Sequence, residues 1–393
     1  MGGQVLRVVS PQPFPSPTPP EVHNGDLEKL LSRRKILKLM WHLTNRCNLA
    51  CSYCYVKVNR FTTDLPTEKM LEIADRINEA GVGTVQMTGG EVSLRPDLLE
   101  IVDRISRKVQ IGLATNGSHI TPDMARFFAE RGVFVSLSID HVIDARNVLT
   151  RKGSDTPLLL ANLRILVEAG VKTGVSSVIT RANFRDVAAL AKHFHELGVY
   201  SWKGIVLSYL GEAKDSGMFD RSMLDYAEEE ETMKTLYGLR QEYLPTGFQV
   251  KTSKGPFPAF YETFAQEKGY GSSCLCGYVK ATLKHDGGLV PCDSIQYPED
   301  YWRGGFAIPS VLEGESLNTI FQESALFQYW ALATAGVVPV GCNNCSIFDS
   351  CRGACRGKSL VRAGNPAGLF GRSEECARNN KIRFEQVPIA RGE

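Results

Sequence analysis

The chain has 393 residues, of which 43% are apolar and 22% are charged, and its 45 basic side chains nearly balance 43 acidic ones. This composition is typical of a globular protein with room for two domains, and so small a net charge argues against nucleic acid or an anionic membrane as a partner. Because the sequence has no uncharged apolar run of about 18 residues and no signal-peptide pattern at its start, we expect a cytoplasmic protein.

The chain begins with a proline-rich arm and then alternates between strand and helix patterns. The arm is predicted over residues 1–34, because the prolines of stretch 11–20 prevent regular helix or sheet. Strand patterns then occur at 35–44, 84–88, 109–116, 133–140, 171–180 and 202–209. Helical periodicity occurs between them at 67–80, 122–131, 158–169 and 184–197. A glycine suited to a helix C-cap follows each of these helices: Gly81, Gly132, Gly170 and Gly198.

Strands that alternate with helices predict an α/β fold with a parallel sheet. Right-handed crossovers would curve six such strands into a partial (β/α)6 barrel of the TIM type over residues 35–215. Ligands are then expected at the carboxyl ends of the strands.

The pattern changes after this region. Residues 216–270 predict a linker on the substrate side, with an acidic helix at 222–240. Residues 271–380 are rich in Cys, Gly and Pro and have little periodicity, which is typical of loops held by metal rather than by a large core. We therefore expect a second, loop-rich domain at 271–380, followed by a tail at 381–393.

The cysteines are best explained as metal ligands. Eleven is an odd number, and a reducing compartment disfavours disulfides. The front group consists of Cys47, Cys51 and Cys54. The rear group consists of Cys274, Cys276, Cys292, Cys342, Cys345, Cys351, Cys355 and Cys376.

The front cysteines follow the first predicted strand directly, so their thiols should meet in one loop at the mouth of the barrel. Iron–sulfur cubanes normally take four thiolates, so three thiolates leave one iron open to another ligand. The alternative is a structural zinc site with His42 as its fourth ligand.

A Cys-x3-Cys-x2-Cys loop after a first strand resembles that of the radical S-adenosylmethionine (radical SAM) enzymes. The resemblance implies that the methionine amino and carboxylate groups of S-adenosylmethionine chelate the open iron of a 4Fe-4S cluster. Reductive cleavage then yields a 5′-deoxyadenosyl radical. Tyr53 holds the aromatic position that the family places against the adenine.

The second predicted strand ends in a motif that resembles the family's Gly-Gly-Glu. It comprises Gly89, Gly90 and Glu91, whose backbone and carboxylate would meet the methionine ammonium. A lone Gly-Gly-Glu usually forms a turn, but this one stands one βα unit after the cysteines, and that position favours a role in cofactor binding.

Later positions resemble other cofactor contacts of the family. Asn116, Ser136 and Ser138 match its ribose contacts, although a turn and a strand edge explain them nearly as well. Arg151 resembles an arginine that pairs with the methionine carboxylate, and a plain surface arginine is the alternative. Leu210 lies in a loop that resembles the one closing over the adenine.

The rear cysteines contain the spacing Cys-x2-Cys-x5-Cys-x3-Cys from residue 342 to residue 355. The whole run resembles the SPASM extension of radical SAM enzymes, which holds two auxiliary 4Fe-4S clusters and brings the expected total to three. The resemblance assigns one auxiliary cluster to Cys274, Cys292 and Cys355. It assigns the other to Cys342, Cys345, Cys351 and Cys376. Cys276 is either an eighth ligand or, if it does not bind, leaves an iron open for substrate. A pair of structural zinc sites is the alternative.

Asp293 directly follows Cys292. An Asp at this position is assigned as the general base in the anaerobic sulfatase-maturing members of the family, and a turn-capping Asp is the alternative.

Relatives with this two-part architecture mostly modify peptides or proteins by oxidation, thioether formation or carbon–carbon crosslinks. We therefore expect a peptide or protein substrate and an external one-electron donor of the flavodoxin or ferredoxin type. Because only about 35 residues precede the first strand, a leader-binding protein would be a separate partner. The first alternative is a porphyrin or other small cofactor precursor as substrate, modified for example by decarboxylation. The second is a non-catalytic electron-transfer or zinc-stapled binding protein.

Overall fold

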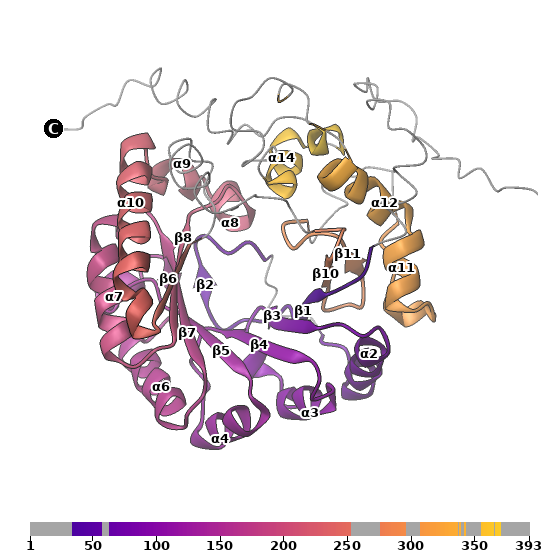
Figure 1. The fold of residues 1–393 in the computed structure, drawn as a ribbon, viewed down its shortest axis with the longest axis horizontal. Helices are drawn as coiled ribbons and strands as arrows, with labels where there is room; N and C mark the ends of the chain where they lie inside the picture. The colour runs from indigo at the N-terminus through magenta and orange to yellow at the C-terminus, as the bar shows by residue number, and fades with distance from the viewer. Residues whose placement is uncertain are drawn as a thin grey trace, which may run out of the picture.

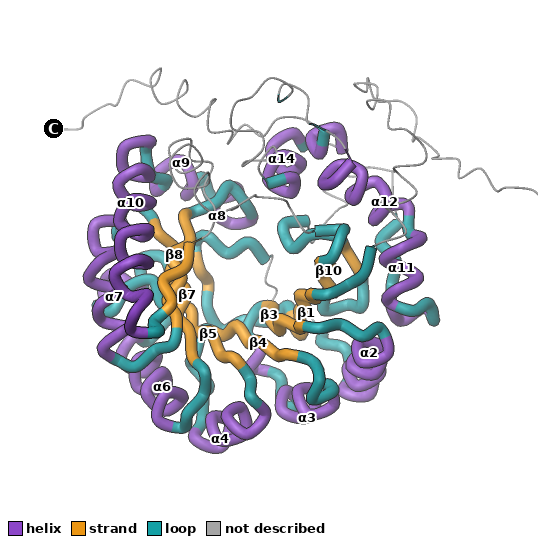
Figure 2. Tube along the Cα trace, in the orientation of Figure 1, coloured by secondary structure: helices purple, strands orange, loops and turns teal. Residues whose placement is uncertain are grey.

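The computed structural model describes residues 34–56, 63–252, 276–295, 307–336, 338, 342, 355–364 and 366–370. Within these residues, none of the helices combines the length and apolar character that crossing a membrane requires. The outer ring of helices and the inner row of strands are distinct in the tube view (Figure 2).

One sheet of nine strands dominates the described part of the chain. Its strand order is β11-β10-β1-β3-β4-β5-β7-β8-β9, and only the β10–β11 pair is antiparallel. Its strands are β1 (Lys38–Thr44), β3 (Thr84–Gly89), β4 (Gln110–Thr115), β5 (Phe134–Ser138), β7 (Thr173–Ile179), β8 (Ser201–Val206), β9 (Gln249–Thr252), β10 (Lys280–Leu283) and β11 (Leu289–Val290). A second, two-stranded sheet pairs β2 (Ala50–Cys51) with β6 (Arg151–Lys152).

The α-helices run along the outer side of the curved sheet and around its open side (Figure 1). They are α2 (Thr67–Glu79), α3 (Leu98–Arg104), α4 (Pro122–Arg131), α5 (Asp144–Asn147), α6 (Thr156–Glu168), α7 (Val187–Glu196), α8 (Gly211–Asp215), α9 (Met218–Ser222), α10 (Tyr226–Tyr243), α11 (Leu317–Glu323), α12 (Ala325–Ala331) and α14 (Arg356–Ala363). Short 3-10 or π turns are η1 (Val92–Leu94), η2 (Phe184–Asp186), η3 (Leu244–Thr246), η6 (Val311–Glu313), η7 (Leu332–Gly336) and η8 (Pro366–Leu369).

The predicted α/β architecture is therefore present. The six predicted strands correspond to β1, β3, β4, β5, β7 and β8, and the four glycines after the predicted helices all have positive φ, as C-caps require. The structure adds β9 from the segment predicted as a linker, and β10 and β11 from the predicted rear domain, all in the same sheet.

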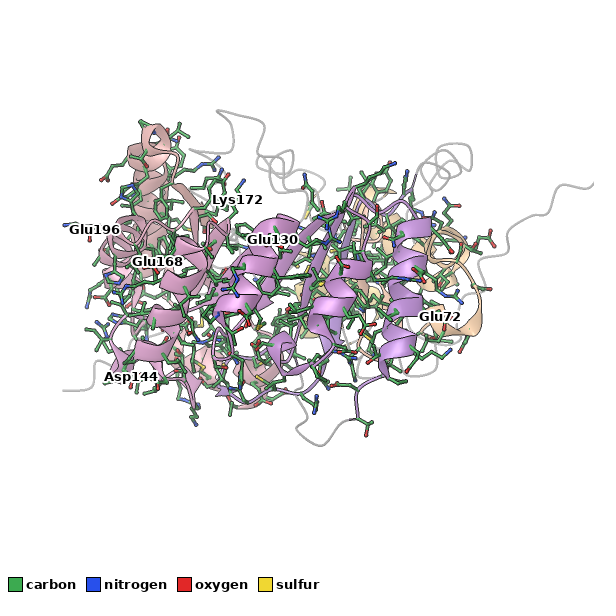
Figure 3. All side chains as sticks on the ribbon, turned by 90° about the horizontal axis from the view of Figure 1, so that it is seen from below. Glu72, Glu130, Asp144, Glu168, Lys172 and Glu196 are labelled. Atoms are coloured by element: carbon green, nitrogen blue, oxygen red, sulfur yellow. The ribbon has the colours of Figure 1, made fainter. Side chains whose placement is uncertain are left out.

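Side-chain alternation separates an apolar outer face of the sheet from a polar concave face. In β1, Leu39, Trp41 and Leu43 are fully buried in the main core that the helices complete. The alternate residues, among them Lys38 and His42, therefore face the concave side. Charged residues such as Glu72 and Glu130 lie on the outer sides of the helices, as seen from below in Figure 3. The concave face is thus free to carry polar chemistry.

Candidate active site

The front cysteines lie in a loop that is fastened to a distant part of the chain. Cys51 belongs to β2 and pairs with Arg151 of β6, and the amide of Ser52 donates to the carbonyl of Thr150 at 2.9 Å. The loop follows β1 directly, so all three cysteines stand beyond the carboxyl end of that strand. This is the end at which a parallel α/β sheet places its ligands.

Two glycines at the end of β3 hold the base of this loop. A Cβ on Gly90 would lie 2.0 Å from the carbonyl oxygen of Arg46, and one on Gly89 would lie 2.4 Å from that of Thr44. The Gly90 amide donates to the carbonyl of Thr44 at 2.8 Å, and the Glu91 amide donates to the carbonyl of Arg46 at 2.7 Å. Only glycine permits so close an approach of the two strand ends, and Gly89 also has a φ of +146°.

Glu91 ties the ends of β3 and β4 together. It is 1% exposed, and its carboxylate accepts from the Thr115 hydroxyl at 2.6 Å, the Asn116 amide at 2.6 Å and the Ser93 amide at 3.0 Å. The Asn116 side-chain amide in turn donates to Asn48 in the cysteine loop at 2.8 Å. These two predicted cofactor contacts therefore brace the loop, and their contact with a cofactor stays a prediction.

Tyr53, Asp140 and Arg151 form a buried chain of hydrogen bonds beside the thiols. The Tyr53 hydroxyl donates to Asp140 and receives a bond from Nη1 of Arg151, both at 2.6 Å. Nε of Arg151 is buried and has no hydrogen-bond partner among the described residues. Burial acts to lower the pKa of Arg151, but Tyr53, Cys51 and Asp140 outweigh it and raise that pKa. An unpaired, permanently charged donor at this point suits an anionic ligand.

Sequence reasoning did not assign a site role to Asp140. Besides Tyr53, its carboxylate accepts from the Thr150 hydroxyl at 2.7 Å and the Val178 amide at 2.9 Å. The available signal was its place at the end of the strand that carries Ser136 and Ser138. The hydroxyl oxygens of Ser136 and Ser176 lie 3.2 Å apart.

The start of α8, beyond β8, also contacts the cysteines. The amide of Glu212 donates to the carbonyl of Cys54 at 2.8 Å, and a Cβ on Gly211 would lie 2.3 Å from the same oxygen. Leu210 immediately precedes this contact, and its predicted place over the adenine stays a prediction.

The three thiols influence one another electrostatically. Burial raises the pKa of Cys47, Cys51 and Cys54, and for Cys54 the added charges of Cys51 and Cys47 help bring the pKa to about 12. No three His, Cys, Asp or Glu side chains of the described residues are grouped to hold a single metal ion. The donor set of three neighbouring thiols from one loop, with a positive charge beside it, fits three-cysteine ligation of an iron–sulfur cluster.

Asp293 meets two residues of the front region. Nε2 of His42 donates to its carboxylate at 2.6 Å, and the Tyr55 hydroxyl also hydrogen-bonds to it. Burial acts to raise the pKa of Asp293, but His42, Lys280 and Tyr55 outweigh it and lower that pKa. His42, the candidate fourth ligand of a zinc site, thus directs Nε2 at Asp293.

Four of the eight rear cysteines lie in the described residues, namely Cys276, Cys292, Cys342 and Cys355. The other four, Cys274, Cys345, Cys351 and Cys376, lie outside them. A Cβ on Gly357, two residues after Cys355, would lie 3.1 Å from the Cys292 sulfur. Cys292 therefore packs on the start of α14, which Cys355 precedes.

Residues 41–207 match the Radical SAM superfamily. The mycofactocin maturase MftC of Mycobacterium tuberculosis is 27% identical over 352 residues, which cover 87% of this chain and 83% of that protein. The PqqA peptide cyclase of Granulibacter bethesdensis is 24% identical over 341 residues, 83% of this chain and 84% of that protein. The Fe-coproporphyrin III synthase of Methanosarcina barkeri is 29% identical over 163 residues, but they span only 40% of this chain and 41% of that protein.

Solved structures share the fold. Streptococcus suis SuiB bound to S-adenosylmethionine has a TM-score of 0.70 and 16% identity, covering 89% of this chain and 80% of that one. The structure of anSMEcpe with bound AdoMet has a TM-score of 0.66 and 19% identity, covering 89% of this chain and 98% of that one.

Proposed function

We propose that this chain, which belongs to the radical SAM superfamily, cleaves S-adenosylmethionine reductively and uses the resulting radical to modify a side chain of a peptide or protein. Relatives aligned along more than four fifths of the chain support this substrate class, since one is a maturase and another a peptide cyclase. SuiB, which shares the fold, is also solved with its precursor peptide SuiA. The reaction types we consider are oxidation, thioether formation and carbon–carbon crosslinking.

In this proposal Cys47, Cys51 and Cys54 hold the 4Fe-4S cluster of the family. When bound, that cluster supplies the electron for cleavage of S-adenosylmethionine and an open iron for its amino and carboxylate groups. Arg151 places its buried Nε at the loop, where a carboxylate would satisfy it. Tyr53, held between Arg151 and Asp140, limits the cofactor's position. The contacts assigned to Gly89, Gly90, Glu91, Asn116, Ser136, Ser138 and Leu210 belong to the same proposal.

For the rear region, residues 271–380, we propose a SPASM-type domain with two auxiliary 4Fe-4S clusters and the ligand sets given above. The packing of Cys292 against the start of α14 supports a shared cluster for Cys292 and Cys355. These clusters would pass on the electron released when the substrate is oxidised. We further propose an external flavodoxin- or ferredoxin-type donor, a separate leader-binding partner and a reducing, cytoplasmic setting.

Asp293 is our candidate general base. His42 and Tyr55 orient its carboxylate, so the acceptor oxygen is fixed before substrate binds. It lies after β11 but contacts β1 and the cysteine loop, which places it between the front and rear regions. A proton released from the substrate on oxidation would move to this carboxylate.

The observation that carries the proposal is the glycine-braced cysteine loop beside the unpaired Arg151 Nε. The test compares the anaerobically reconstituted wild type with the Cys47/Cys51/Cys54→Ala variant. We expect about twelve irons per chain to fall to about eight, and 5′-deoxyadenosine formation to disappear. Little iron with zinc in its place would contradict the proposal and favour a zinc-stapled binding protein.

A porphyrin substrate is the second candidate, favoured by the match to the coproporphyrin synthase. That match covers less than half of either chain, so it supports the candidate less than the two longer alignments support a peptide. The mass of the product formed from coproporphyrin III or from a candidate peptide separates the two.

A further inference from the structure

Four lysines lie on the strands at the two ends of the curved sheet. Cross-strand neighbours pair Lys38 of β1 with Lys280 of β10, and Lys203 of β8 with Lys251 of β9. β8 and β10 stand on opposite arms of the sheet in Figure 1. The two lysine pairs therefore belong to opposite arms.

Alternation places these lysines on the concave face. Lys38 precedes Leu39, which is fully buried on the outer side, and paired residues of parallel strands share a face. Lys203 stands next to Gly204, where a Cβ would meet Leu236 of the outer helix α10 at 3.0 Å. Lys203 therefore points to the opposite, concave side.

The charges of these lysines act on one another across the concave face. Burial lowers the pKa of Lys203, and the charges of Lys38, Lys280 and Lys251 lower it further. Burial also lowers the pKa of Lys38, and the charges of Lys280 and Lys251 lower it further. Since both pairs also face the concave side of the same sheet, the four lysines form one cluster there.

Carboxylates of the described residues form no ion pair with Lys38, Lys203 or Lys251. The ammonium of Lys251 instead lies near two aromatic rings, 5.8 Å from the Phe134 ring centroid and 5.9 Å from that of Tyr200. Lys280 acts electrostatically on Asp293, so the cluster and the candidate base share this face. Grouped like charges repel, and a bound anion would relieve that repulsion.

We propose that Lys38, Lys203 and Lys251 bind carboxylates of the substrate, and that the substrate is an acidic peptide segment. That the substrate is a peptide rests on the proposed function, and the lysines add the chemistry by which that peptide is recognised. Along β1, Lys38 precedes His42 by four residues, which corresponds to about 13 Å of strand. An extended peptide spans that distance in about four residues, so the acidic group should lie about four residues from the modified side chain.

Binding to the reconstituted holoenzyme tests this without any turnover. The probes are a fluorescein-labelled peptide with adjacent glutamates, the same peptide with glutamines, and coproporphyrin III. The variants are Lys38→Gln, Lys203→Gln and Lys251→Gln, with Lys203→Arg to keep the charge. Lys192→Gln is the control, because Lys192 is 70% exposed on α7 and pairs with Glu196 at 3.8 Å. Iron content and Tm verify that each variant is folded.

We expect each Lys→Gln change to weaken binding of the glutamate peptide by about tenfold, and Lys203→Arg and Lys192→Gln to bind like the wild type. The glutamine peptide should bind weakly to every variant. Equal binding of the glutamate peptide by wild type and folded Lys→Gln variants would overturn the carboxylate site. If only coproporphyrin III depends on the lysines, the carboxylate site stands and the peptide substrate of the proposed function fails.

Discussion

The front and rear cysteine regions are held in different ways. The front loop is fixed by backbone contacts to the end of β3, to β6 and to the start of α8, with glycines where the chains approach most closely. In the rear, Cys276 and Cys292 join a small apolar cluster separate from the main core. Its fully or largely buried members are Cys292, Ile295, Leu326, Trp330, Ala333, Leu360, Leu369 and Phe370. We infer that the chain itself shapes the front site, whereas bound clusters contribute more to the shape of the rear.

Gly90→Ala should have the largest effect, because its Cβ would overlap a backbone oxygen that cannot move without displacing the cysteine loop. We expect the front cluster to be lost and 5′-deoxyadenosine formation to fall by at least about 100-fold. Iron per chain and product formation, measured after anaerobic reconstitution, provide the readout.

Gly238→Ala is the matched control for that substitution. Gly238 lies within α10, and a Cβ there would meet nothing within 4 Å. Alanine favours helix by about 1 kcal/mol over glycine, so activity should persist and stability should not fall. A fully active Gly90→Ala enzyme would contradict the idea that this approach shapes the loop.

Arg151→Lys separates ligand contact from loop shape within the front region. Lysine keeps the charge but lacks Nε and the forked geometry, so the KM for S-adenosylmethionine should rise about tenfold while the iron content stays constant. Arg164→Lys on the exposed side of α6 should change neither quantity. An unchanged KM would show that Arg151 serves the Tyr53–Asp140 chain alone.

The barrel strands could be predicted because they carry a buried outer row of side chains and because four of the helices between them end at a glycine. Leu39, Trp41 and Leu43 show that alternation, and Gly132 caps α4 with a φ of +66°. β9, β10 and β11 were missed because strands of two to four residues carry almost no periodicity. β9 and β10 also pair with strands that lie far away in sequence, β8 and β1.

The candidate site was predictable only where a local motif exists. Cysteine spacing and Gly89-Gly90-Glu91 are local, and the structure brings them together. The His42–Asp293 hydrogen bond joins residues 251 positions apart, so no short sequence pattern could predict it. Likewise, the role of Asp140 depends on Tyr53 and Arg151, which arrive from other loops.

Gly357→Ala tests the rear counterpart of Gly90. Its Cβ would lie 3.0 Å from the Ser294 Cβ and 3.1 Å from the Cys292 sulfur, so side chains rather than backbone must shift. The gain in helix propensity, about 1 kcal/mol, offsets part of that cost. We expect a few-fold loss of product formation and partial loss of rear iron, as measured by iron analysis and electron paramagnetic resonance. A loss as severe as that of Gly90→Ala would remove the distinction between the regions.

Lys203→Met should have the smallest effect, and of opposite sign. Lys203 is half-buried among lysines, so an apolar side chain of similar length removes both repulsion and the cost of partly burying a charge. The Tm should rise by a few degrees, as expected for a stabilisation of about 1 kcal/mol in a chain of this size. Lys192→Met, on the outer side of α7, should leave the Tm nearly unchanged. If Lys203→Met lowers the Tm, the ammonium is already neutralised within the folded chain, and the concave face holds no charge in need of a substrate carboxylate.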